Sequence, residues 1–131
     1  MFEGEYLNGE KWNGKGYNKN GIIDFEIKKG NGKVKEYDED GKLIFEGEYL
    51  NGERNGKGKE FYISGKLEFE GEYLNGKRNG KGKKYNNNGE LIFEGEYSNG
   101  ERWNGKGYNK KGFVAFEIKN GKWKRKSIFC I

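Results

Sequence analysis

Residues 45–58 read Phe-Glu-Gly-Glu-Tyr-Leu-Asn-Gly-Glu-Arg-Asn-Gly-Lys-Gly, and this stretch decides the fold. It returns almost unchanged at residues 69–82, and edited versions occupy residues 2–16 and 93–107. The pair Asn51-Gly52 is a strong hairpin signal, because both central residues of a type I′ turn need a positive φ. The stretch therefore predicts two antiparallel strands joined by a tight turn.

The chain divides into six units when it is aligned on its Phe-Glu dipeptides. The units begin at Phe2, Phe25, Phe45, Phe69, Phe93 and Phe116, with spacings of 20 to 24 residues. A period of this length indicates a repeat architecture in which each unit packs on its neighbours. An isolated hairpin is marginal in water, but several in series can form one long twisted sheet. The predicted fold is all-β, an elongated solenoid of stacked antiparallel β-hairpins, with residues 1–131 as a single repeat domain.

Side chains alternate across a strand, and this assigns a role to each residue type in the unit. A two-residue loop at Asn51-Gly52 predicts the pairs Tyr49 with Arg54, Gly47 with Gly56, and Phe45 with Gly58. One face then carries rings, together with glycines that leave slots for those rings. The other face carries glutamate and lysine, with Glu46 predicted opposite Lys57 in a pair worth about 0.2–1 kcal/mol.

The rings and glycines of the middle units are interpreted as structural residues. Regular glycine weakens a strand by itself, so its recurrence indicates that close approach is needed there. The structural set is Phe45, Gly47, Tyr49, Gly52, Gly56, Gly58, Phe69, Gly71, Tyr73, Gly76, Gly80 and Gly82. The rings expected in the core also include Tyr6 and Tyr97.

Two kinds of unit depart from the pattern. The first and fifth units insert Trp12 and Trp103 after the turn, and the second unit is short and has Ile27 where others have glycine. These departures predict bulges or bends. The tryptophans are candidates either for packing or for contact with a partner.

Composition limits the chemistry that the chain can perform. The 131 residues include 24 glycines, no proline and no histidine, so triads built on histidine are impossible. The lone cysteine, Cys130, excludes intrachain disulfides and multi-cysteine metal sites. The Gly-Lys-Gly tripeptides lack the strand-to-helix context of a phosphate-binding loop. We therefore expect no enzyme, no cofactor, no metal and no small-molecule substrate.

The C-terminal end, residues 117–131, carries most of the net charge. It holds five basic residues against Glu117, which gives +4 of the total +5. A Trp among basic residues is typical of membrane-surface segments, although a charged terminal strand also blocks edge-to-edge pairing. We interpret this end as a basic segment that caps the last hairpin. Its candidate lipid contacts are Lys122, Trp123, Lys124, Arg125 and Lys126.

Location is inferred from what the sequence lacks. The N-terminus has no basic region followed by an apolar run, and no apolar stretch approaches the roughly 20 residues that span a bilayer. The sequence predicts a cytoplasmic protein, with peripheral membrane attachment as the alternative.

The full motif resembles the MORN repeat (membrane occupation and recognition nexus). The matching segments are residues 45–49, 51–58, 69–73, 75–82, 93–97 and 99–107. The second and sixth units match poorly. The resemblance implies a rod of stacked hairpins with no activity of its own, whose relatives act as scaffolds, dimerise, bind partners or bind phospholipid. The family's glycines and rings are structural, so the resemblance assigns no functional site.

Three functions remain open from the sequence. The first is a protein-binding or self-associating scaffold, with a protein partner or a homodimer. The second is peripheral binding to an anionic phospholipid surface through the basic C-terminal end. The third is carbohydrate binding on aromatic ridges. Nucleic acid is not an expected partner, because the 116 residues before the basic end sum to only +1.

Overall fold

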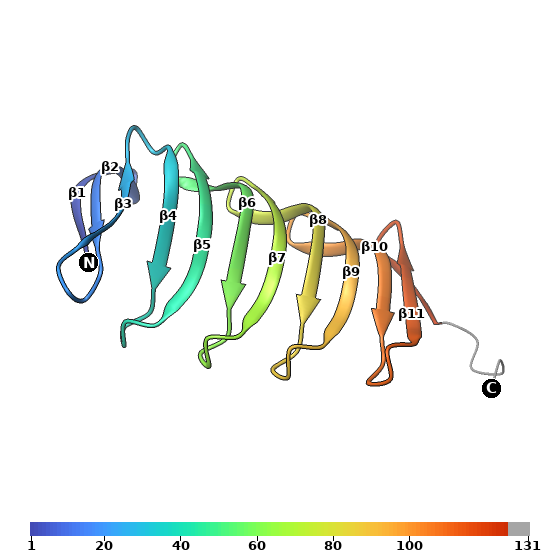
Figure 1. Ribbon diagram of the computed structural model, residues 1–131. Helices are drawn as coiled ribbons and strands as arrows, with labels where there is room; N and C mark the ends of the chain where they lie inside the picture. Colours follow the sequence, from blue (N-terminus) through green and yellow to red (C-terminus); the bar gives the residue numbers. More distant parts are fainter. Residues whose placement is uncertain (126–131) are drawn as a thin grey trace.

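A computed structural model describes residues 1–125. In this part of the chain all regular structure is β, which confirms the predicted fold class. Figure 1 shows the hairpins side by side, with strands running across the long axis of the rod. The strands are β1 (Phe2–Leu7), β2 (Glu10–Tyr17), β3 (Ile23–Ile27), β4 (Gly32–Tyr37), β5 (Leu43–Leu50), β6 (Glu53–Phe61), β7 (Leu67–Leu74), β8 (Lys77–Tyr85), β9 (Leu91–Ser98), β10 (Glu101–Tyr108), β11 (Val114–Lys119) and β12 (Lys122–Arg125).

Every neighbouring pair of strands is antiparallel and follows chain order. Strands β1 to β3 form a three-stranded sheet, and β4 to β12 form a nine-stranded sheet. Between β3 and β4 the only backbone pairing in residues 1–125 is an isolated bridge, Lys28 with Asn31. Side chains also join these strands, since Lys35 and Tyr37 of β4 donate to the Asp24 carboxylate of β3. The interruption falls in the short second unit, where the sequence predicts a bend.

The tight turns have the predicted geometry. Asn51 and Gly52 have φ values of 53° and 83°, as a type I′ turn requires. From Gly30 onward each tight turn is also tied to the preceding part of the sheet; the Gly76 N–H, for example, donates to the Arg54 carbonyl at 2.9 Å. At the opposite edge the Asn86 side chain accepts hydrogen bonds from backbone N–H groups two and four residues later. The Gly76 bond links two successive hairpins, and the Asn86 bonds fix the loop that joins β8 to β9.

The strand pairing differs from the predicted one beyond the turn. Tyr49 pairs with Arg54 as predicted, but Gly47 pairs with Gly58 and Phe45 with Glu60. A bulge sets three residues, 55–57, opposite the single Glu48.

Glycine makes this bulge possible. Gly56 has a φ of 90°, which residues with a side chain rarely adopt. The Glu48 carboxylate accepts the Lys57 N–H at 2.8 Å and so satisfies a backbone donor at the bulge. As a result Glu46 lies opposite Lys59, and the predicted pair with Lys57 is wrong.

The first and fifth units carry a different bulge. Tyr6 pairs with Lys11 and Glu5 with Asn13, so Trp12 is the extra residue. In the fifth unit the register skips Trp103 in the same way. The bulges predicted at these units are confirmed.

The core is a row of rings shared between neighbouring units. Phe45 and Phe69 have no exposed surface, and Tyr73 is 4% exposed. Tyr73 packs edge-on against Phe45 of the preceding unit, with ring centroids 5.3 Å apart. A Cβ at Gly58 would lie 2.7 Å from the Phe45 ring, so glycine provides the slot for this ring as predicted.

Tyr6 departs from the predicted core. Its side chain is 59% exposed, whereas Tyr97 is 5% exposed. Tyr97 packs on Phe69 of the unit before it, at 5.1 Å. Within residues 1–125 no ring of an earlier unit stands against Tyr6, and its prediction as a core residue is wrong for that reason.

Candidate functional site

A groove of about 1180 Å³ runs along the polar face of the nine-stranded sheet, over strands β4 to β9, and Asp24 and Phe25 of β3 also line it. Its floor is the backbone of a row of glycines that pair across the strands. A Cβ at these positions would point to the opposite, aromatic face, as at Gly82, where it would lie 2.5 Å from the Phe69 ring, so the channel follows the strand backbone between the charged side chains. The floor glycines are Gly47, Gly58, Gly71, Gly82 and Gly95.

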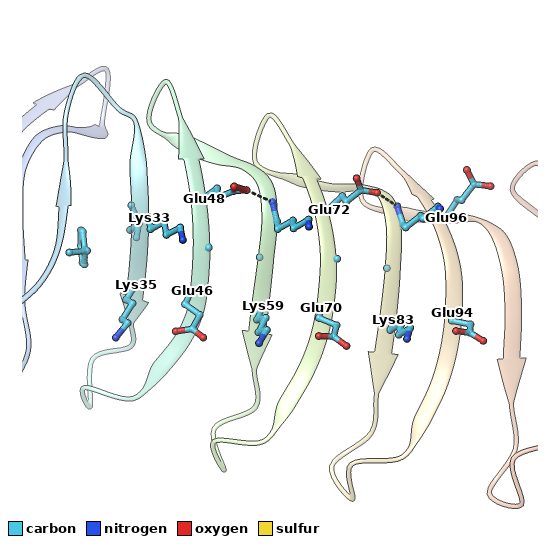
Figure 2. Close-up of a pocket in the computed structure, with 18 of the residues that line it drawn as sticks. Lys33, Lys35, Glu46, Glu48, Lys59, Glu70, Glu72, Lys83, Glu94 and Glu96 are labelled. Atoms are coloured by element: carbon cyan, nitrogen blue, oxygen red, sulfur yellow. Dashed lines mark hydrogen bonds between the residues drawn. The ribbon is translucent and has the colours of Figure 1, made fainter.

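Two rows of charged side chains border the floor, as Figure 2 shows. In each row lysine and glutamate alternate from strand to strand. The first rail is Lys35, Glu46, Lys59, Glu70, Lys83 and Glu94. The second rail is Lys33, Glu48, Lys57, Glu72, Lys81 and Glu96.

The rails differ in how firmly they are held. In the second rail Glu48 and Glu72 accept backbone N–H groups at the bulges, at 2.8 and 2.7 Å, drawn as dashed lines in Figure 2. In the first rail Glu70 lies between Lys59 and Lys83 and accepts the Tyr85 hydroxyl at 2.8 Å. The carboxylates are thus positioned by their neighbours, whereas lysines such as Lys59 and Lys83 are exposed.

The charges lining the groove almost cancel. Six lysines stand against six glutamates and Asp24, for a formal net charge of −1. Among residues 1–125 no group of His, Cys, Asp and Glu could hold a metal ion. The groove can therefore offer regularly placed hydrogen-bond donors and acceptors, but it provides no concentrated charge.

The opposite, aromatic face carries a second repeated arrangement, which we call the Tyr–Glu–Arg triad. In strands β6 to β8 the Tyr73 hydroxyl donates to the Glu60 carboxylate at 2.6 Å. Arg78 donates to the same carboxylate through Nε at 3.1 Å and Nη2 at 2.7 Å. Its guanidinium also stacks over Phe69, 4.1 Å from the ring centroid. Strands β4 to β6 repeat this geometry with Glu36, Tyr49 and Arg54.

The triads shift the pKa values of their members. Burial alone would raise the pKa of Glu60, but hydrogen bonds from Arg78 and Tyr73 outweigh it and hold this pKa below its usual value. Burial and the bond to Glu60 together raise the pKa of Tyr73. Glu36 and Tyr49 shift in the same directions for the same reasons. Both triads are therefore ion pairs with a neutral tyrosine at neutral pH.

The tryptophans predicted as contacts do not form one site. Trp12 lies half-buried on β2 in the three-stranded sheet, while Trp103 lies on β10 and is 43% exposed. The Trp103 ring covers a turn, since a Cβ at Gly121 would lie 2.8 Å from it. Trp123 is 60% exposed and packs against Phe116 at 6.2 Å.

The predicted basic segment is described only in part. Lys122 and Lys124 are exposed on β12, which ends at Arg125. Lys126 and the rest of the predicted cap lie outside the described residues.

Comparison with known families agrees with this geometry. The MORN repeat family model matches residues 45–66 and 69–90. These two segments are MORN repeats. The matched segments are the third and fourth units, whose strands β5 to β8 form the centre of the groove. MORN repeats are generally interaction or scaffold modules, and the family is a structural repeat rather than an enzyme family.

No curated protein matches the chain. In residues 1–125 no helix has the length and hydropathy to cross a membrane.

Sequence reasoning identified the polar face but missed both the groove and the triads. The signal for the groove is the alternation of Glu-Gly-Glu with Lys-Gly-Lys in successive strands. The triads join residues 13 and 18 positions apart, such as Glu60 with Tyr73 and Arg78. Both spacings depend on the bulged register, so a regular ladder does not predict them.

Proposed function

We propose that this MORN-repeat chain is a cytoplasmic, non-enzymatic scaffold module that binds a partner protein in its groove. The observation that carries the proposal is the pair of rails around the glycine floor. The partner is an extended polypeptide segment that carries both signs of charge. Its affinity is the sum of small contacts repeated over several units, as is usual for repeat proteins that present elongated surfaces.

The length of the groove favours a polymer over a small molecule. The groove crosses six strands, β4 to β9, and neighbouring strands lie about 4.8 Å apart, so it extends for about 24 Å. Small-molecule sites are usually enclosed hollows that cover most of the ligand. A channel this long and shallow suits a chain lying along the rod.

The charge pattern favours a polypeptide over a polyanion. Like charges recur on every second strand, about 9.6 Å apart. Three residues of an extended chain cover about 9–10 Å, so a segment with a charge at every third position matches one rail. Nucleic acid binding depends on neutralising many phosphates, and the groove has no excess of positive charge with which to do so.

The test begins with peptides selected from a random display library on the purified 131-residue chain. Their contact surface is mapped from amide chemical shifts. A rail variant combines Lys59→Gln, Glu70→Gln and Lys83→Gln, which removes charge without changing side-chain length much. The matched control makes the same changes at exposed turn positions, Lys66→Gln, Glu90→Gln and Lys110→Gln.

We expect the selected peptides to shift the amide signals of the floor glycines. Their affinity should fall at least tenfold for the rail variant and stay unchanged for the control variant. If the peptides shift only the amide signals of residues on the aromatic face, the groove is refuted as the binding surface. Equal affinity for the rail variant and the control variant also refutes it.

The exposed aromatic and basic side chains of β12 favour a second candidate function. Trp123 is 60% exposed and lies between the exposed Lys122 and Lys124. Each basic residue near an anionic leaflet is worth about 1 kcal/mol. Co-sedimentation with vesicles containing anionic phospholipid at low salt tests this candidate. A Trp123→Ala, Lys124→Gln variant that sediments as well as the unmodified chain contradicts it.

A further inference from the structure

The Tyr–Glu–Arg triad is incomplete in the fifth unit. The tyrosine and the arginine recur as Tyr97 and Arg102, which pair with each other across β9 and β10. The position 13 residues before Tyr97 holds Lys84 instead of glutamate. Lys84 pairs with the Phe of each flanking strand, as Glu60 does one unit earlier, so the two residues occupy equivalent places.

The substitution leaves hydrogen-bond donors without an acceptor. Tyr97 is 5% exposed, and its hydroxyl is the one buried side-chain polar atom in residues 1–125 without a hydrogen-bond partner. Arg102 still stacks on the preceding phenylalanine, Phe93, 4.5 Å from the ring centroid. No ion pair joins Arg102 to a carboxylate within the described residues. A buried hydroxyl without a partner is rare in proteins and calls for a physical explanation.

Lys84 has its own partner. Its ammonium pairs with Glu68, and Glu68 stands where the neighbouring units have Ile44 and Ile92. The two departures from the repeat thus form a pair that draws the lysine head away from the triad position. The fifth unit keeps the two donors of the triad and places a lysine, held by Glu68 and by the Tyr62 ring, beside them.

We propose that Tyr97, Arg102 and Lys84 form a binding site for a carboxylate supplied by another molecule. In the complete triad one carboxylate oxygen accepts Tyr73 and Arg78 Nε, and the other accepts Arg78 Nη2. This two-oxygen geometry fits a carboxylate, because an arginine fork matches its planar shape. The Lys84 ammonium, which Glu68 holds beside this position, adds positive charge that attracts the incoming carboxylate.

The site lies on the aromatic face, away from the groove. The carboxylate site and the peptide-binding groove are therefore two separate proposals, and a negative result for one does not refute the other. The bound carboxylate could come from two sources, a free small molecule or an acidic side chain of a protein. The probes are sodium acetate for the first and acetyl-glutamate amide for the second, each compared with sodium chloride at equal ionic strength.

The measurement is the NMR chemical shift of the Nε–Hε group of each arginine in the intact chain. Arg54 and Arg78 already hold a carboxylate and serve as internal references. We expect the Arg102 signal alone to shift and to saturate, with a midpoint of about 10–100 mM because so small an anion has few contacts. A lower midpoint with acetyl-glutamate amide assigns the site to a protein side chain, and equal midpoints assign it to free carboxylates.

Three variants make the test specific. Lys84→Glu supplies the carboxylate internally and abolishes the Arg102 response. Tyr97→Phe keeps the ring and weakens binding about fivefold to tenfold, the effect of one lost hydrogen bond. Tyr73→Phe, the same change in a complete triad, leaves the response intact. An unmoved Arg102 signal, or equal shifts of all three arginines, overturns the proposal, as does an undiminished response in both the Lys84→Glu and the Tyr97→Phe variants.

Discussion

The same substitution in two equivalent tyrosines should have different effects on stability. Tyr73→Phe and Tyr97→Phe each remove one hydroxyl from a ring that is about 95% buried, since the two residues are 4% and 5% exposed. The rings have nearly identical neighbours, with edge-on phenylalanines at 5.3 and 5.8 Å for Tyr73 and at 5.1 and 5.7 Å for Tyr97. The contributions of ring packing and of ring burial to the free energy of unfolding are therefore equal in the two variants and cancel when the variants are compared.

What remains is the hydrogen bond. The Tyr73 hydroxyl donates to the ionised Glu60 at 2.6 Å, and a bond to a charged group contributes about 1.5–3 kcal/mol. Glu60 keeps both bonds from Arg78, so the loss should fall near the lower end, at about 1–2 kcal/mol. Tyr97 has no partner to lose, and its removal relieves the cost of a buried unpaired hydroxyl. We expect Tyr97→Phe to be neutral or stabilising by about 1 kcal/mol, which gives a difference of about 1–3 kcal/mol between the two variants.

Urea unfolding followed by tryptophan fluorescence and by circular dichroism measures this difference. The two variants should share the slope of the unmodified chain, since they expose equal surface on unfolding. Coincident transitions from the two probes establish that one free energy describes the unfolding. A difference between the variants below about 0.5 kcal/mol would refute the reasoning. It would mean that the Tyr97 hydroxyl has an acceptor equivalent to Glu60, such as a bound water.

Three further predictions test the same framework. The double variant Lys84→Glu, Glu68→Ile gives Tyr97 a carboxylate and should raise the free energy of unfolding by about 1–2 kcal/mol, measured by urea titration. Gly71→Ala should cost more than about 3 kcal/mol in the same assay, because its Cβ would lie 2.5 Å from the Lys81 carbonyl oxygen. The pKa of Glu60 in the fold lies below its usual value of 4.5. The ionised Glu60 therefore stabilises the fold at pH values above 4.5, and this stability is lost as the pH falls through the folded-state pKa. Unfolding measured from about pH 6 to pH 3 should therefore depend less on pH in the Glu60→Gln variant.

Much of the fold follows from local sequence, because the turns dictate it. Asn51 and Gly52 can adopt the positive φ values of a type I′ turn, and this alone places two strands side by side. Recurrence of the motif then fixes the solenoid. The inserted Trp12 and Trp103 also indicate bulges correctly, since each adds one residue to a strand whose partner keeps its length.

The register beyond the turn could not be derived in the same way. Glu46 and Glu48 face a Lys-Gly-Lys strand, and complementary charges are obtained with either Lys57 or Lys59 opposite Glu46. The bulge at Gly56 decides between them, and it depends on the conformation of a single glycine together with a side-chain-to-backbone bond. A two-residue shift in register keeps every side chain on its face, so face patterning carries no information about it.

The candidate sites depend on that shift in different ways. The groove could be anticipated as a polar face, but its straight glycine floor exists only because Gly47 pairs with Gly58 and not with Gly56. The triads could not be predicted, since the bulged register sets Glu60, and not the predicted Gly58, opposite Phe45. Tyr6 shows the same limit for the core, because burial of its ring depends on a phenylalanine from an earlier unit.

Differences between units are informative in a solenoid because each unit contacts only its neighbours. In such a structure stability is a sum of local terms, so one unit can lose a favourable interaction without unfolding the rest. The rails keep the same lysines and glutamates in every unit from β4 to β9, whereas the triad position changes from Glu36 and Glu60 to Lys84. A partner bound in the proposed groove would therefore meet a uniform row of charges that sets no unique position along the rod. A Tyr97 hydroxyl without a partner, beside an Arg102 without an ion pair, occurs once in residues 1–125, and a carboxylate bound there would fix a partner at one place along that row.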